Sequence, residues 1–158
     1  NGLLDALRDQ FTLDWHGIHG GAHWARVRAN GLRLAPVTGA DVQVVELFAW
    51  LHDARRFDDG CDPDHGWRAA ELAFELRGTY FDLDDLQFGL LAQALTGHSD
   101  GQTTGHVTVR TCWDADRLDL GRCGVDIDPS LLCTAAARDP ELIAWASARS
   151  RRFAEAER

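Results

Sequence analysis

Residues 42–53 form the segment of this 158-residue chain that most limits its fold. The segment is apolar nearly all round, and Asp41 directly before it is a good helix N-cap. A helix without a polar face has to be buried, so we expect this one at the centre of the protein. The β-branched pair Val44 and Val45 leaves a strand open as the alternative, although the length of the segment favours a helix.

Amphipathic helices are indicated along most of the remaining chain by apolar residues at helical spacing. We predict them over residues 3–11, 22–34, 64–76, 83–95, the second half of 107–120, and 140–158. A strand over Val107–Val109 stays open, and the second helix is expected to end near Pro36 and Gly39. The sequence therefore predicts an all-α fold, a compact bundle of about six or seven helices in one domain over residues 1–158.

The charged residues narrow the classes of partner. The formal net charge of −9 argues against binding to a DNA or RNA backbone, so we expect no nucleic acid polymer as a partner. All 16 basic residues are Arg, whose planar fork suits phosphate and carboxylate groups. A GC-rich genome explains most of this preference, yet an acidic surface is compatible with a local basic pocket for a small phosphorylated ligand.

The sequence carries no signal for a membrane or for export. No stretch approaches the apolar length of a membrane span, and residues 1–5 lack the basic start and apolar run of a signal peptide. The four Cys residues show no CxxC spacing, so thiolate zinc binding and dithiol redox chemistry are not indicated. We expect a cytoplasmic protein with reduced thiols and no membrane partner.

The pair His52-Asp53 lies at the end of the most apolar predicted helix. An ionised Asp buried there without a partner would cost several kcal/mol, on the order of the penalty for an unpaired charge. A bound cation is one way to offset that cost. The alternative is an Asp that caps the helix end beside an incidental His.

Three elements of the sequence match, in the same order, the pattern of a known family: His23 with Arg26 and Val27, the pair His52-Asp53, and Asp116 within residues 114–119. In this pattern the chain resembles the HD superfamily of metal-dependent phosphohydrolases, in particular its small single-domain bacterial members. The matches lie on predicted helices and span residues 23–119, which is most of the chain.

The resemblance implies that four residues bind one cation: His23, His52, Asp53 and Asp116. Asp114 competes with Asp116 for the last position, which the family motif places directly before an Arg/Lys-Leu pair. In dinuclear members two further His residues hold a second ion and the Asp of the HD pair bridges both ions. His65 and His98 occupy these positions here; the alternative is that both are ordinary residues at helix ends.

The other histidines are weaker candidates. His106 is a substitute for His98, but a His in a polar loop is usually only solvated. His16 and His19 lie in a Gly-rich segment just before His23, and we interpret them as surface residues of a mobile loop.

Imidazole and carboxylate ligands suit one or two divalent transition metal ions, namely Fe, Mn, Co, Ni or Zn, and Mg is disfavoured. In the dinuclear case two ions about 3.5–4 Å apart share the carboxylate of Asp53 and a water whose pKa falls toward about 7. Asp53 is then the catalytic bridge and orienting group, not a nucleophile. Arg26, Arg56 and Arg117 are the candidates for binding the anionic part of a substrate, with surface salt bridges as the alternative.

These residues predict a hydrolase of a small phosphorylated substrate, either a nucleotide or another phosphate ester. One alternative is a diiron oxygenase that cleaves a C–C or C–P bond, similar to HD relatives such as myo-inositol oxygenase. A second alternative is a non-catalytic metal-binding or sensor module. Whether the chain forms a homo-oligomer stays open.

Overall fold

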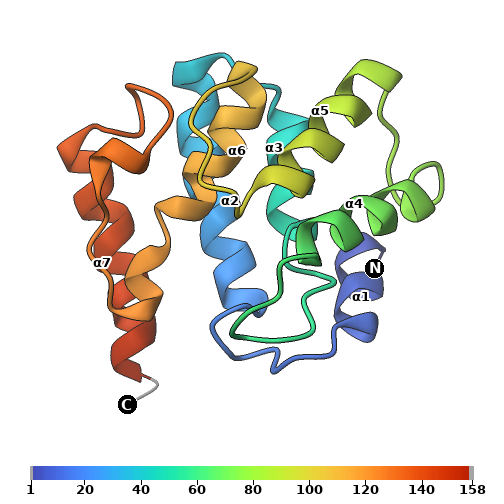
Figure 1. Cartoon of the computed structure of the whole chain (residues 1–158), viewed down its shortest axis with the longest axis horizontal. Coiled ribbons are helices and arrows are strands. Elements are labelled where there is room, and N and C mark those ends of the chain that lie inside the picture. The colour runs from blue at the N-terminus through green and yellow to red at the C-terminus, as the bar shows by residue number, and fades with distance from the viewer. Residues whose placement is uncertain (1, 157–158) are drawn as a thin grey trace.

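The computed structural model describes residues 2–156, which fold into α-helices and two short 3₁₀ helices without a strand (Figure 1). In chain order these are α1 (Leu3–Gln10), α2 (Gly21–Thr38), α3 (Val42–Leu51), α4 (His65–Leu76), α5 (Asp85–Gly97), α6 (Val107–Arg117), η1 (Leu120–Cys123), η2 (Pro129–Leu131) and α7 (Pro140–Ala156). The predicted all-α fold is confirmed. Among the residues described, none of these helices combines the length and the apolarity needed to cross a bilayer.

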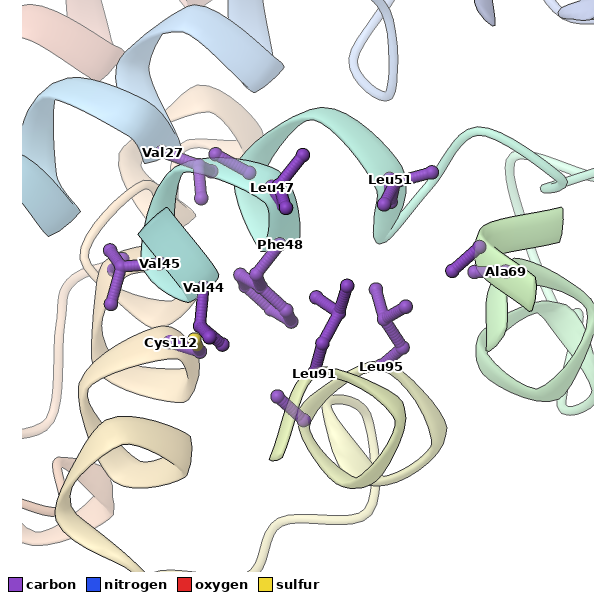
Figure 2. Close-up of a cluster of buried hydrophobic side chains, with 14 of the residues drawn as sticks. Val27, Val44, Val45, Leu47, Phe48, Leu51, Ala69, Leu91, Leu95 and Cys112 are labelled. Atoms are coloured by element: carbon purple, nitrogen blue, oxygen red, sulfur yellow. The ribbon is translucent and has the colours of Figure 1, made fainter. Parts of the chain in front are cut away.

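Helix α3 is the centre of the main hydrophobic core, as its sequence predicts. The carboxylate of Asp41 accepts a hydrogen bond of 3.1 Å from the backbone N–H of Val44, which starts the helix. Figure 2 shows Phe48 facing the aliphatic side chains of Leu91 and Leu95 on α5. Because α2, α5 and α6 all pack against α3, a helix without a polar face is stable here, and the strand alternative is wrong.

Helix α6 departs from our prediction in its first half. It is helical from Val107 onward, so the alternative of a strand over residues 107–109 is wrong. The side chain of His106 caps the helix by accepting a hydrogen bond of 3.0 Å from the N–H of Thr108. The Thr108 hydroxyl in turn accepts one of 3.0 Å from the N–H of Asp41. Such tertiary contacts and the burial of Val109 outweigh the weak preference of β-branched residues against helix.

Helix α2 continues through Pro36 and ends at Thr38, close to Pro36 and Gly39 as expected. A proline removes one hydrogen bond from a helix, and here that loss falls in the last turn. Gly39 then ends the helix with φ of 80°, a left-handed conformation that glycine adopts without strain.

Helix α7 covers the opposite flank from α1 and α4 (Figure 1). It packs on a second, smaller hydrophobic cluster, whose buried members are Leu34, Leu118, Leu132, Ala137, Leu142 and Ala146. This cluster joins α7 to the ends of α2 and α6, so α6 lies between the two cores.

Gly66 allows α4 and α5 to approach closely near their ends. A Cβ atom on Gly66 would lie 2.5 Å from the carbonyl oxygen of Leu95 and 3.2 Å from that of Thr96. Any side chain larger than hydrogen would therefore push the two helices apart. The approach places His65, the first residue of α4, beside His98 at the end of α5.

We predict that Gly66→Ala lowers the free energy of unfolding by about 1–3 kcal/mol, the usual cost of overpacking, although alanine favours helix. Chemical denaturation of the purified variant measures this change. Gly89→Ala on α5 is the matched control, because a Cβ atom there meets nothing within 4 Å, and it should be neutral or stabilising. Equal effects of the two variants would contradict the close-approach argument.

Candidate metal centre

The carboxylate of Asp53, directly after α3, lies between two pairs of histidines. Its Oδ2 atom is 3.4 Å from Nε2 of both His23 and His52. Its Oδ1 atom is 3.4 Å from Nε2 of His65 and 3.5 Å from Nε2 of His98. All five side chains are buried, with at most 5% of each residue exposed. One carboxylate therefore faces a separate group of nitrogens with each of its oxygens.

The first group joins α2, α3 and α6. The Nε2 atoms of His23 and His52 are 3.0 Å apart. Oδ1 of Asp116 is 3.3 Å from the first of these nitrogens and 3.4 Å from the second. Both nitrogens therefore lie within 3.4 Å of one oxygen of Asp53 and one oxygen of Asp116.

The second group joins the start of α4 to the end of α5. The Nε2 atoms of His65 and His98 are 2.8 Å apart, and both face Oδ1 of Asp53. This group offers two nitrogens and one carboxylate oxygen.

The protein fixes which nitrogen of each ring points inward. Each Nδ1 atom lies within hydrogen-bond distance of a protein oxygen. For His23 this is Oδ2 of Asp119 at 2.6 Å, and for His52, His65 and His98 it is the carbonyl oxygen of Ala49, Asp62 and Leu95 at 3.1, 2.5 and 2.7 Å. A carbonyl needs a donor, so His52, His65 and His98 carry their proton on Nδ1 when they are neutral, and the Nε2 atom of all four rings faces Asp53.

These orientations test whether the site suits a cation. Two Nε2 lone pairs that face each other at 2.8 or 3.0 Å repel unless positive charge lies between them. The buried carboxylates need the same compensation. A proton or a metal ion supplies it, and imidazole and carboxylate donors suit Fe, Mn, Co, Ni or Zn. The buried His and Asp side chains can therefore bind a metal.

Both carboxylates of the centre stay ionised. Burial alone would raise their pKa, but the charge of His52 and hydrogen bonds from the surrounding rings hold the pKa of Asp53 well below its usual value. The pKa of Asp116 is held low in the same way, by His52 and His23. Burial and Arg122 work against protonation of His23, yet its hydrogen bonds to three carboxylates raise its pKa to about 10.

One solved structure resembles this chain along nearly its whole length. The chain is similar to the crystal structure of a predicted HD superfamily hydrolase from an uncultured Thermotogales bacterium, with a TM-score of 0.70 and 26% sequence identity. The match covers 98% of this chain and 88% of the other. The chain has the HD-domain fold. No protein-family model matches the sequence, and neither does a curated protein. The cluster and the similar structure fit a metal-dependent hydrolase.

Sequence reasoning missed one support of this HD-domain centre. Asp119 is fully buried and holds Nδ1 of His23, while its Oδ1 atom accepts a hydrogen bond of 2.7 Å from Nε of Arg26. Arg26 is therefore engaged by Asp119, although we expected it to bind substrate. The available signal was spacing: Arg26 lies three residues after His23, and Asp119 three residues after Asp116.

Asp114 faces away from the histidines and binds the connection to α7. Its carboxylate accepts hydrogen bonds from the backbone N–H of Cys133 at 2.6 Å and of Thr134 at 3.0 Å, and from the Thr134 hydroxyl at 2.7 Å. Of the two alternatives for the last ligand, the geometry favours Asp116.

The other two arginines occupy different surroundings. Arg56 lies beside the second histidine pair, with one terminal nitrogen 3.1 Å from Nε2 of His65. Carbonyl oxygens of Asp58 and Gly60 hold the rest of its guanidinium at 2.8 Å each. The guanidinium of Arg117 donates instead to the carbonyl oxygens of Leu131 and Gln102.

His19 is not the surface residue that we expected. It is 7% exposed, and its Nδ1 atom lies 2.7 Å from a carboxylate oxygen of Asp59. Burial is the main cause that lowers its pKa. His16 is exposed, as expected, and His106 caps α6 while His98 lies in the cluster.

We predict opposite effects for two alanine variants on α6. Asp116→Ala removes a candidate metal donor and should weaken binding of Mn²⁺ by at least about 100-fold, measured by calorimetry on metal-free protein. Asp114→Ala leaves buried donors at Cys133 and Thr134 unpaired, so it should cost about 3 kcal/mol of unfolding free energy while the folded protein still binds metal. The reverse pattern would make Asp114 the ligand.

Metal binding should also depend on pH. Below its pKa of about 10, His23 carries a proton on the nitrogen that a cation needs, so binding weakens as the pH falls. The apparent affinity for Mn²⁺ should rise by up to about tenfold per pH unit between about 6.5 and 8.5 for each proton displaced. Calorimetry in buffers of different ionisation enthalpy counts these protons, and His23→Gln should flatten the slope. A constant affinity over this range would contradict the assignment.

Proposed function

We propose that this protein is a metal-dependent hydrolase of a small phosphorylated substrate, either a nucleotide or another phosphate ester. The observation that carries the proposal is the position of Asp53, whose two oxygens face two histidine pairs with inward Nε2 atoms. The similarity to a predicted HD superfamily hydrolase supports a hydrolytic reaction.

The residues divide into two ion positions in this proposal. His23, His52, Asp116 and Oδ2 of Asp53 would hold the first ion, and His65, His98 and Oδ1 of Asp53 the second. Bound transition metal ions supply water of near-neutral pKa and positive charge for an anionic transition state. The chain's part is to hold the donors in place before substrate arrives, which lowers the cost of reorganisation.

Three side chains have further roles in this proposal. Asp53 acts as the bridge that fixes the two positions relative to each other and does not attack the substrate. Arg56 is the best candidate for binding phosphate oxygens, because its terminal nitrogen faces the centre beside His65 while backbone carbonyls hold its other nitrogens. Arg26 acts through Asp119 and is a positioning residue.

The test is release of inorganic phosphate from nucleotides and simple phosphate esters, with Mn²⁺, Co²⁺, Ni²⁺, Zn²⁺, Fe²⁺ or Mg²⁺ added to metal-free protein. Activity should follow the transition metals, and His52→Ala should lower it by at least about 100-fold together with metal content. His16→Ala is the matched control, because it removes an exposed histidine and should change neither quantity.

The alternative functions give different outcomes. A diiron oxygenase would take up oxygen when iron-loaded, anaerobically prepared protein meets air in the presence of an organic substrate, and would release no phosphate by hydrolysis. A non-catalytic metal-binding module would bind the ions and turn nothing over. Either result would contradict the hydrolase proposal.

A further inference from the structure

A pocket of about 170 Å³ lies beside the candidate metal centre, on the side of His98. Its walls come from the ends of α5 and α6 and from residues 120–132, which belong to the connection between α6 and α7. A molecule in this pocket lies against His98, which is one residue of the candidate metal centre. The volume resembles that of an engineered cavity of about 150 Å³ in another protein, which binds benzene.

One part of the pocket lining is an aliphatic wall. It is formed by Leu120, Ile127, Leu131 and Leu132. Leu131 is 51% exposed, so much of its apolar surface faces water. An apolar group bound against this wall would remove that surface from water, which favours binding.

The charged residues of the pocket do not offer a free cation. The guanidinium of Arg117 donates to the carbonyl oxygens of Leu131 at 2.9 Å and Gln102 at 2.6 Å, and to Sγ of Cys133 at 3.2 Å. At the exposed edge, the carboxylate of Asp128 accepts hydrogen bonds from the backbone N–H and hydroxyl of Ser130, which lower the pKa of Asp128. A second negative charge on a bound molecule would therefore meet a carboxylate.

The aliphatic wall is fixed relative to α6, the helix that carries Asp116. Asp114 binds the backbone at Cys133 and Thr134, directly after the wall residues. Arg117 binds the carbonyl of Leu131 from the same helix. The position of the pocket relative to the candidate metal ligands is thus fixed before any molecule binds. Binding then needs less loss of conformational entropy in the protein.

From this geometry we infer that the pocket holds the organic group of the substrate, and that this group is uncharged and apolar, with about six to ten non-hydrogen atoms. The inference rests on the proposed hydrolase function and names its substrate class, a phosphate monoester with no second anionic group. In the reaction the oxygen of water bonds to phosphorus, the ester P–O bond breaks, and one water proton ends on the leaving alcohol.

Three substrates test this inference: phenyl phosphate, 4-carboxyphenyl phosphate and methyl phosphate. Because phenol is a better leaving group than methanol, binding of the matching phosphonates measures the contribution of the pocket separately. With the metal-loaded protein, kcat/KM for phenyl phosphate should exceed that for each of the others by at least about tenfold. Binding of the matching phosphonates, which are not hydrolysed, is measured in parallel by calorimetry and should follow the same order.

Two variants connect these preferences to the pocket. Leu131→Ala should reduce the preference for phenyl over methyl phosphate by at least about fivefold, mainly through KM. Asp128→Asn keeps the oxygen that accepts from Ser130 and should selectively improve 4-carboxyphenyl phosphate. Leu86→Ala, an exposed leucine on α5 outside the pocket, is the control and should leave both preferences unchanged.

The two measurements separate the inference from the proposed function. Hydrolysis without a preference among the three esters, or a preference that Leu131→Ala leaves unchanged, overturns the pocket assignment and leaves the hydrolase. Selective binding of phenylphosphonate that Leu131→Ala removes, with no hydrolysis of any ester, overturns the hydrolase and leaves an apolar anion-binding pocket. If the protein shows no binding preference and hydrolyses none of the esters, both the pocket assignment and the hydrolase proposal are overturned.

Discussion

An ionised carboxylate in the middle of a helical core is the constraint on which this structure depends. Asp53 is 3% exposed, and the Nε2 atoms of four histidines surround its oxygens at 3.4–3.5 Å. Without neighbouring positive charge such a burial would cost several kcal/mol, on the order of the penalty for an unpaired ion. The packing of the five helices from α2 through α6 brings these side chains together. Positive charge between them, either protons or metal ions, offsets the cost of burying Asp53.

The histidines are oriented by two different devices. His52, His65 and His98 each point Nδ1 at the carbonyl oxygen three residues earlier, so the local backbone sets which nitrogen faces inward. His23 uses the carboxylate of Asp119, which is 96 residues away in sequence. Three of the four orientations therefore follow from local chain geometry, and the fourth requires α2 and the end of α6 to be assembled.

The features that the sequence predicts depend mainly on local contacts, and those that it does not predict depend on distant contacts. An apolar segment without a polar face predicts a buried central helix, and α3 is that helix. The HD pattern selected six residues that do lie together, because the spacing of ligands along helices is visible in one dimension. The contact of His19 with Asp59 and the support of His23 by Asp119 were not predictable, since each depends on a partner distant in sequence.

The start of α6 was not predicted as helix for a related reason. Its first residues favour strand by propensity alone, and the contacts that decide otherwise come from Asp41 on the preceding side of α3. Likewise the aliphatic pocket is built from residues 120–132, a segment without clear periodicity, whose position is set by hydrogen bonds to α6.

The close approach of α4 and α5 at Gly66 sets how near His65 and His98 lie to each other. His65 is the first residue of α4 and His98 directly follows α5, so the distance between their Nε2 atoms depends on the room that one glycine leaves between the two helices. Helix ends open more readily than helix centres. A movement of these two ends would therefore separate His65 from His98, the pair of donors that the proposed function assigns to the second ion.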